Sequence, residues 1–302
     1  MDIEKIKRSK TTEELLEFSI VNIDKPTGPT SFTVSDFVRK VSNARKTSHF
    51  GTLDPMVTGV LPIALNRACK LTGFFLGEDK EYVGIMRVHS DVKMLEIQKI
   101  IDGKFLGKIK QTPPVRSRVK RQEREREIKG FKLIEQDGKD ILFISDVQGG
   151  TYIRKLIDDL GKEENIVGAH MLELRRIRAG IFLEDRSKEL NYPSVNLYDF
   201  EKAFEEYKNG GVDADKRLRE ILIPGEVVGE LFENVFVKRT SLKKLFTGKP
   251  ILREDLSKEI KINGERIVVF SDDKIPKLVG IYNVINGEEI LAKADFVLQV
   301  MK

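Results

Sequence analysis

Hydrophobic and polar residues alternate in several short segments of the chain, as they do in strands with one buried face. Residues 82–88 and 171–177 show this alternation, whereas residues 19–24 predict a short apolar strand. Residues 131–134 and 141–144 predict two further strands. Asp137 and Gly138 separate two of them and indicate a hairpin turn. These segments therefore predict a sheet in the first two thirds of the chain.

Helical spacing appears between these strands. Phe37, Val38 and Val41 predict a helix from about Phe32 to Asn43, after a turn over residues 25–31. Residues 151–160 predict a second helix that ends at Gly161. Its buried stripe comprises Ile153, Leu156, Ile157 and Leu160. We also expect a polar N-terminal arm with one short helix over residues 1–18, and a polar helical stretch over 192–215 that is interrupted at 209–211.

The pattern changes near Glu233, where short β-rich segments surround one short helix at residues 241–246. The segments are residues 234–237, 266–270, 278–285 and 289–292, with turns at 263–264 and 286–287. This pattern is typical of a small all-β domain. We therefore expect a first domain over residues 1–230, including the 1–18 arm, and a second over 231–302.

The composition excludes several classes of protein. The 302 residues are 40% hydrophobic and 33% charged, so the chain can form a large core. No apolar run approaches the ~20 residues of a membrane span, and the N-terminus does not resemble a signal peptide. One cysteine, Cys69, and three histidines without ligand spacing predict neither a disulfide nor a metal site. These features predict a cytoplasmic protein that does not contact a membrane.

The net charge of +5 is concentrated between Lys104 and Lys129, where ten Lys or Arg and three Glu give +7. Such a patch favours phosphate binding and hence a nucleic-acid partner. The alternative is a salt-bridged strand or helix face, because Glu and Arg alternate over residues 123–127.

The segment from His49 to Pro62 holds a single carboxylate, Asp54, between Gly51 and Gly59 and next to Pro55. Glycine and proline favour turns at these positions, so we expect a shaped loop that presents Asp54. An isolated acid in such a loop is a candidate nucleophile or general base. The structural alternative is a helix cap or an Asp-Pro turn, which the loop alone favours.

Five further segments occur in the same order as motifs of one known family, and together with the Asp54 loop they are specific. They are residues 24–31 (DKPTGPTS), 79–82 (DKEY), 111–121 (QTPPVRSRVKR), 150–154 (GTYIR) and 168–176 (GAHMLELRR). The chain resembles the TruB family of pseudouridine synthases, especially its archaeal and eukaryotic dyskerin-type members, and residues 88–92 (VHSDV) favour that form. The C-terminal unit resembles an RNA-binding PUA domain.

The resemblance implies an α+β fold: a pseudouridine synthase domain with a mixed, mainly antiparallel central sheet and flanking helices, followed by a small PUA-like β-barrel. It implies isomerisation of uridine to pseudouridine in RNA, with no cofactor and no metal. Asp54 matches the catalytic aspartate, Arg154 its arginine partner and Tyr82 the tyrosine that stacks on the target base. The structural alternatives are an exposed helical arginine and a strand-core tyrosine.

Other residues match less specific positions. Tyr152, Leu174 and His49 match residues around the flipped-out nucleotide. Arg118 stands where the family usually has a small residue. The residues that we expect to contact RNA are Arg116, Arg118, Lys120 and Arg121 in the basic segment, and Lys243, Lys244 and Lys249 in the C-terminal unit. A solvated helix face explains the last three equally well.

Three functions remain open at this point. The first is the catalytic subunit of an H/ACA ribonucleoprotein that a guide RNA directs to rRNA, with a Gar-type protein, a Nop-type protein and a kink-turn binder as partners. The second is a stand-alone synthase for the T-loop uridine of tRNA. The third is a non-catalytic RNA-binding scaffold, against which the presence of Asp54, Tyr82 and Arg154 together argues.

Overall fold

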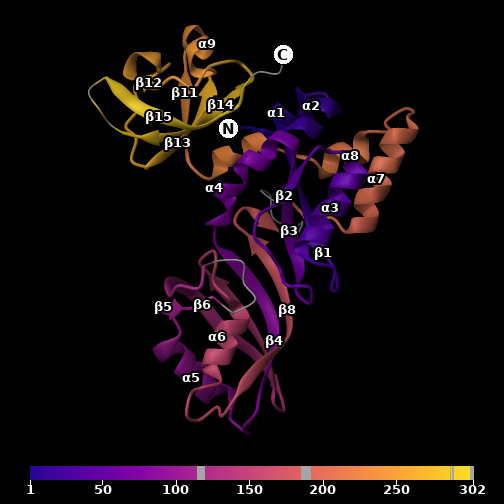
Figure 1. Cartoon of the computed structure of the whole chain (residues 1–302), viewed down its shortest axis with the longest axis vertical. Helices are drawn as coiled ribbons and strands as arrows, with labels where there is room; N and C mark the ends of the chain where they lie inside the picture. Colours follow the sequence, from indigo (N-terminus) through magenta and orange to yellow (C-terminus); the bar gives the residue numbers. More distant parts are fainter. Residues whose placement is uncertain (114–119, 185–191, 286, 288, 300–302) are drawn as a thin grey trace. The chain divides into compact units, whose positions relative to one another are not determined.

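The computed structural model describes residues 1–113, 120–184, 192–285, 287 and 289–299 (Figure 1). The chain forms two compact units. One is Ile20–Ile221, and the other combines Met1–Ser19 with Leu222–Lys302. The predicted domain boundary between residues 230 and 231 stays a prediction.

The Ile20–Ile221 unit is built on a central sheet in which neighbouring strands are hydrogen-bonded in the order β1-β3-β8-β4-β7-β6-β5. The strands are β1 (Ser19–Lys25), β3 (Thr58–Leu65), β8 (Ala169–Ala179), β4 (Lys80–Val88), β7 (Asp140–Val147), β6 (Arg124–Asp137) and β5 (Gly107–Gln111). Two short strands, β2 (Thr47–His49) and β9 (Phe182–Leu183), pair with β3 and β8. Only β3 and β8 run parallel among these pairs of described strands, so the sheet is mixed and mainly antiparallel, as expected.

Helices connect the strands of this unit. They are α3 (Ser31–Ser42), the 3-10 helix η1 (Asn66–Leu71), α4 (Thr72–Leu76), α5 (Met94–Lys104), α6 (Ile153–Leu160), α7 (Leu197–Asn209) and α8 (Lys216–Ile221). The expected helix over residues 32–43 is confirmed, and Asn43 ends it in a left-handed conformation with φ of 52°. Helix α6 buries the predicted stripe of Ile153, Leu156, Ile157 and Leu160. No helix among the described residues is long and apolar enough to span a membrane.

The second unit carries five strands in the order β11-β13-β14-β15-β12. They are β11 (Glu233–Val237), β13 (Arg266–Ser271), β14 (Leu278–Val284), β15 (Ile290–Val297) and β12 (Ile251–Leu252). The other elements are α1 (Ile3–Arg8), α2 (Thr12–Glu17), β10 (Ile223–Pro224), η2 (Gly225–Glu230), η3 (Arg239–Ser241), α9 (Leu242–Leu245) and η4 (Arg253–Asp255). Val235, Ile267, Val279 and Leu291 belong to the core of the sheet. This unit has the β-rich architecture expected of a PUA-like domain.

The structure corrects three local predictions. The N-terminal arm holds two capped helices instead of one, because Asp2 and Thr11 each accept a bond from a helical amide. Helix α6 begins at Ile153, two residues later than expected. The predicted loop from His49 to Pro62 ends at Val57, because Thr58–Leu65 is a strand. Pro62 lacks an amide hydrogen, yet its carbonyl accepts from the Phe50 amide at 2.9 Å, so the strand tolerates it.

Candidate active site

Asp54 lies in the connection between β2 and β3, residues 50–57, which we call the Asp54 loop. The flanking Gly51 and Gly59 have φ of +107° and +98°, which residues with a side chain rarely adopt. A Cβ on Gly59 would lie 2.2 Å from the Arg176 carbonyl, so the close approach of β3 to β8 also needs glycine. The Asp54 carbonyl accepts from the Val57 amide at 3.0 Å and closes a turn. The turn therefore uses the main chain and leaves the carboxylate for another partner.

Main-chain groups of the Asp54 loop are bound by residues at the start of α3 and in the turn before it. The Ser31 hydroxyl at the start of α3 donates to the Leu53 carbonyl at 2.9 Å and accepts from the Leu53 amide at 2.7 Å. The Gly28 amide donates to the Pro55 carbonyl at 2.9 Å. Because Phe50, Leu53 and Val57 are also buried, both ends of the loop are anchored in the core.

Lys25 at the end of β1 is fully buried and binds the loop from behind. Its Nζ donates to the carbonyls of Pro26, Pro55 and Val57 at 2.8, 3.0 and 2.8 Å. Burial lowers the pKa of Lys25, and the negative charge of Asp54 opposes that shift. Lys25 thus supplies a buried positive charge close to the Asp54 carboxylate.

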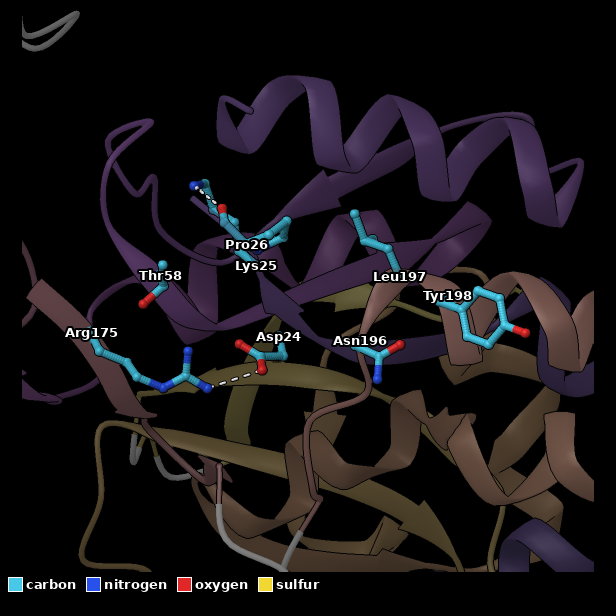
Figure 2. Close-up of a pocket in the computed structure, with 8 residues that line it drawn as sticks. All are labelled: Asp24, Lys25, Pro26, Thr58, Arg175, Asn196, Leu197 and Tyr198. Atoms are coloured by element: carbon cyan, nitrogen blue, oxygen red, sulfur yellow. Dashed lines mark hydrogen bonds and ion pairs between the residues drawn. The ribbon is translucent and has the colours of Figure 1, made fainter. Parts of the chain in front are cut away.

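A pocket of about 340 Å³ opens beside Lys25 (Figure 2). Asp24, Thr58, Arg175 and Tyr198 line it, together with Pro26, Asn196 and Leu197. The Arg175 guanidinium donates to Asp24 at 3.0 Å and also pairs with Glu184. The charges at this pocket are therefore already balanced within the chain.

Arg154 lies in the first turn of α6, and its Nε is 3.0 Å from Oδ2 of Asp54. The two side chains are 59% and 48% exposed, so the pair faces solvent. A cation in the first turn is unfavourable with the positive end of a helix, and α6 has no acid there. The Asp54 carboxylate compensates for this placement, which favours a functional pair over a surface arginine without a role.

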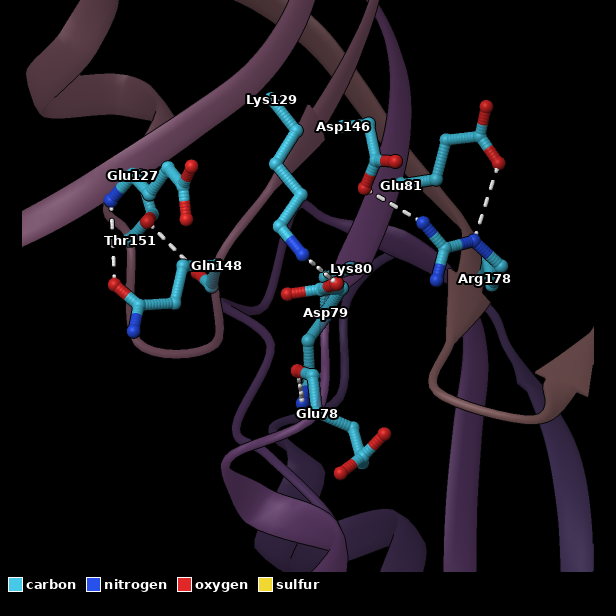
Figure 3. Close-up of polar contacts among 10 residues, drawn as sticks. All are labelled: Glu78, Asp79, Lys80, Glu81, Glu127, Lys129, Asp146, Gln148, Thr151 and Arg178. Carbon is cyan, nitrogen blue, oxygen red and sulfur yellow. Dashed lines mark hydrogen bonds and ion pairs between the residues drawn. The ribbon is translucent and has the colours of Figure 1, made fainter. Parts of the chain in front are cut away.

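The residues before Arg154 are also held in place. The buried side chain of Gln111 donates to the Tyr152 carbonyl at 3.3 Å and accepts from the Tyr152 amide at 3.0 Å. The turn before it is tied to β6, because Gln148 exchanges two bonds with Glu127 and its carbonyl accepts from the Thr151 hydroxyl (Figure 3). The segment that leads into Arg154 is thus anchored at two points to other strands.

A second group in Figure 3 surrounds Lys80, which lies two residues before Tyr82. The buried Nζ of Lys80 donates to the carbonyls of Phe75 and Leu76 in the last turn of α4 and of Glu78 just after it. Burial lowers the pKa of Lys80 to about 8, and the positive charge of Arg176 adds to that shift. The neighbouring acids Asp79, Glu81 and Asp146 pair with Lys129 and Arg178.

Tyr82 and Leu174 lie on the adjacent strands β4 and β8 and are each 8% exposed. The residue opposite Tyr82 on β8 is Arg176, whose guanidinium is fully buried. Arg176 donates through Nε to the Val60 carbonyl at 2.7 Å and through Nη2 to the Gly51 carbonyl at 3.1 Å. Burial lowers the pKa of Arg176, and the interactions with Tyr82 oppose that shift.

His49 is the last residue of β2, and its Nε2 lies 3.0 Å from the Thr52 hydroxyl. It therefore flanks the Asp54 loop. Among the described residues, no cluster of three or more His, Cys, Asp or Glu could hold a metal ion.

The basic segment divides into paired and exposed parts. On the β5–β6 hairpin, Lys108 and Lys110 pair with Glu125 and Glu123 at 2.9 and 3.5 Å, as the salt-bridged alternative predicted. Lys120 and Arg121 are exposed on the connection between these strands. Arg116 and Arg118 lie outside the described residues.

The C-terminal lysines also differ from one another. Lys244 pairs with the buried Asp255 at 2.6 Å. Burial acts to raise the pKa of Asp255, but bonds from Lys244, Ser241 and the Leu252 amide hold it below its usual range. Lys244 thus has a structural partner, whereas Lys243 and Lys249 are both exposed.

The sequence interpretation assigned no role to Lys25, Gln111 or Arg176. All three lie inside the recognised motifs, so their signal was present. The sequence nevertheless could not indicate that they are buried and bind main-chain groups of the Asp54 loop and of Tyr152.

Comparisons with known proteins agree with this geometry. Residues 39–153 match the model of the TruB family pseudouridylate synthase N-terminal domain. Residues 154–228 match that of the tRNA pseudouridylate synthase B C-terminal domain. A probable tRNA pseudouridine synthase B of Nanoarchaeum equitans is 41% identical over 86% of this chain and 75% of its own length. The corresponding protein of Methanocaldococcus jannaschii is 37% identical over 94% of this chain and 81% of its own length.

Solved structures extend the likeness across both units. A Cbf5–Nop10–Gar1 complex contains a chain with a TM-score of 0.85 and 31% identity, covering 97% of this chain and 89% of that chain. An H/ACA ribonucleoprotein bound to a substrate RNA containing 2′-deoxyuridine gives a TM-score of 0.83 and 30% identity, with the same coverage. On its family matches and on its identity to these relatives, the chain belongs to the TruB family of pseudouridine synthases.

Proposed function

We propose that this chain isomerises uridine to pseudouridine in RNA and that Asp54, Arg154 and Tyr82 are its catalytic residues. The observation that carries the proposal is the ion pair of Arg154 with Asp54, which joins residues a hundred positions apart in the sequence. Tyr82 adds an aromatic ring from β4, on the strand next to β8. A scaffold without catalytic activity needs no such arrangement.

The reaction balances within the substrate. The bond between C1′ of the ribose and N1 of uracil breaks, the base turns, and a bond from C1′ to C5 forms. C5 loses its proton and N1 gains one, so no oxidant, reductant or cosubstrate is consumed. Asp54 acts as an anion on the base or the sugar, and Arg154 balances the charge of that carboxylate and orients it. In this proposal Tyr82 stacks on the target base.

The remaining site residues would shape the pocket of the flipped-out nucleotide. Leu174 is buried on β8, and the main chain of Tyr152 is fixed by Gln111. His49 flanks the loop beside Thr52. Apolar and aromatic surfaces of this kind favour a base that has left its stack. The exposed Lys120 and Arg121 would bind phosphate groups of the RNA, as would Lys243.

We further propose that the chain is the catalytic subunit of a guide-directed H/ACA ribonucleoprotein that modifies rRNA. Support comes from the two solved complexes, whose matching chains cover both units. One contains Cbf5, Nop10 and Gar1, and the other is an H/ACA ribonucleoprotein bound to a substrate RNA. The expected partners are a guide RNA, a Gar-type protein, a Nop-type protein and a kink-turn binder. The single cysteine is consistent with our proposal of a cytoplasmic location.

A second candidate is action on the T-loop uridine of tRNA without a guide. It is favoured by the curated relatives, which are named probable tRNA pseudouridine synthase B. The two candidates share the same site and differ in how the uridine is selected.

Release of tritium from RNA labelled at C5 of uracil tests these proposals. The purified chain is incubated with tRNA alone, and with rRNA fragments plus guide RNA and the three accessory proteins. Asp54→Asn is the matched control, because it keeps the shape of the side chain and removes the charge. We expect release that this variant abolishes without loss of RNA affinity. No release under any condition would overturn the enzymatic proposal, and release from bare tRNA alone would overturn the guide-directed one.

A further inference from the structure

Two segments beside Asp54 are almost free of charge, although 33% of the residues of the chain are charged. Residues 26–35 carry no charged side chain, and Asp54 carries the only one in residues 50–66. Each segment nevertheless exposes a large apolar side chain, since Phe32 is 69% exposed and Met56 is 72% exposed. The proposed reaction gives neither side chain a role. A single exposed apolar residue is common, but two of them on an uncharged surface beside a candidate catalytic residue indicate a binding surface.

Hydrogen bonds hold these two segments side by side. The Ser31 hydroxyl binds both main-chain groups of Leu53, and the Gly28 amide donates to the Pro55 carbonyl at 2.9 Å. Asp54 lies between Leu53 and Pro55, so it is the middle residue of the stretch that the first segment binds. The first segment therefore runs directly alongside the candidate catalytic residue.

Phe32 and Met56 continue this stretch at its two ends. Phe32 directly follows Ser31 in the first turn of α3, and Met56 directly follows Pro55 in the loop. The contacts on either side of Asp54 are thus each followed by one exposed apolar side chain. The Asp54 side chain is itself 48% exposed, so a nucleotide that reaches its carboxylate comes close to both.

The chemistry of this surface selects the part of an RNA that it can bind. Phosphate groups are bound mainly by lysine and arginine, and neither segment contains one of these residues. A nucleobase has a flat face that stacks on an aromatic ring and packs against a methionine, whatever the identity of the base. When a target uridine leaves its stack, the bases on both sides of it lose a stacking partner. The surface therefore suits these flanking bases.

We propose that Phe32 and Met56 pack against the two bases that flank the target uridine and replace the stacking that is lost when the uridine turns toward Asp54. The proposal rests on the function proposed above, since it places the uridine at Asp54. It adds a contact with the RNA that lies outside the pocket of the flipped-out nucleotide. Because this contact does not involve phosphate groups, it is insensitive to salt, in contrast to the contacts of the basic segment.

A cycle that combines protein variants with RNA variants tests this proposal on the full chain. The RNA is the T-arm hairpin of tRNA, or an rRNA fragment paired with its guide in the assembly with accessory proteins, whichever is bound. It is prepared intact, or with an abasic nucleotide on the 5′ or the 3′ side of the target uridine. We expect Phe32→Ala to raise Kd about 5- to 50-fold with intact RNA, and by less than about twofold with one of the two abasic RNAs. Met56→Ala should give a smaller loss of affinity, which disappears with the other abasic RNA.

Leu95→Ala is the matched control, because Leu95 is likewise the second residue of its helix, α5, and is 70% exposed. It should leave Kd unchanged. If Phe32→Ala or Met56→Ala weakened binding equally with intact RNA and with both abasic RNAs, that side chain would contact something other than a flanking base, such as a protein partner. That result would overturn the proposal, as would binding to neither RNA.

A stability measurement separates binding from folding. Because Phe32 is exposed, Phe32→Ala should shift Tm by less than about 2 °C. A larger fall would assign the ring to the fold and would also overturn the proposal. Since Kd and Tm are independent of turnover, their outcome is distinct from a failure of the proposed reaction, which the release of tritium reports.

Discussion

The Asp54 loop and the β5–β6 hairpin both display charged side chains, but they are held in opposite ways. Three buried side chains donate hydrogen bonds to main-chain carbonyls of the loop. Lys25 binds the Pro55 carbonyl, Ser31 the Leu53 carbonyl and Arg176 the Gly51 carbonyl. The hairpin is held by backbone pairing, and its lysines bind glutamates across the strands at exposed positions.

The contrast separates two requirements of an enzyme that acts on RNA. Hydrogen bonds to the main chain inside the core are not screened by salt, and they fix the position of the Asp54 carboxylate. Catalysis requires such a fixed position, because the reacting groups must be held in a defined geometry. Exposed ion pairs contribute little stability and exchange readily with phosphate groups. We therefore expect substitutions of the buried donors that bind the loop to alter the catalytic rate and the stability of the fold. We expect substitutions on the β5–β6 hairpin and its connection to alter RNA affinity and the salt dependence of that affinity.

Arg154→Ala should give the largest effect. Without its partner the Asp54 carboxylate loses charge compensation and orientation, so we expect the single-turnover rate to fall about 10²- to 10³-fold. Tm should stay nearly constant, because half-exposed ion pairs contribute about 0–1 kcal/mol. Arg39→Ala removes a comparable pair with Asp36 on α3 and should leave the rate unchanged. A large fall in Tm for Arg154→Ala would instead indicate a structural pair.

Lys25→Met tests the hydrogen bonds that the buried lysine donates to the Asp54 loop. Three carbonyls lose their donor at a buried position, and we expect the free energy of unfolding in urea to fall by about 2–4 kcal/mol. Turnover should fall with it, because the loop is no longer held. The exposed Lys40, which pairs with Asp36, provides a control in Lys40→Met, expected to cost less than about 1 kcal/mol. An equal loss of unfolding free energy in Lys25→Met and Lys40→Met would show that the buried donor stabilises the fold no more than an exposed ion pair does.

The basic segment offers a prediction about binding. Replacing Lys120 and Arg121 by alanine should weaken RNA binding about tenfold and reduce the slope of log affinity against log salt by about 1–2. The double variant Lys108→Gln, Glu125→Gln removes an exposed ion pair without changing net charge. It should leave affinity within about twofold. If it weakened binding as much as the alanine variant, the division into paired and exposed parts would be incorrect.

Lys80 predicts an effect on stability that appears only at alkaline pH. Its pKa is about 8 in the fold, against 10.5 for an unburied lysine. Between these values the unfolded chain binds more protons, so this residue makes stability rise with pH, by up to about 3 kcal/mol from pH 8 to 10.5. Lys80→Met should remove that rise relative to wild type in urea unfolding at each pH, whereas the exposed Lys99→Met should retain it. Parallel curves for wild type and Lys80→Met would exclude the shift.

Much of the fold could be predicted from the sequence because the relevant signals are local. Alternate residues of β4 and β7 are buried, and the apolar stripe of α6 is buried as its spacing predicted, because burial removes apolar surface from water. Gly51 and Gly59 have positive φ, a conformation that glycine adopts readily. The two glycines in the sequence therefore already indicated the unusual backbone of the Asp54 loop. Strand β3 escaped prediction because Pro62 indicates a turn, and only its pairing with β1 and β2 overrides that local preference.

The sequence by itself thus determined many of the helices and strands, the change to a β-rich pattern near residue 233 and a lone carboxylate in a loop bounded by glycines. Tertiary structure decided which charges meet. Arg154 reaches Asp54, Lys244 reaches Asp255, and the buried Arg176 binds the main-chain carbonyls of Gly51 and Val60. Spacing along the chain carries no information about such contacts, because burial and pairing depend on which strands the sheet brings together. The electrostatic energy of a charged side chain depends on its burial and on the charges near it in space, and not on its neighbours in the sequence.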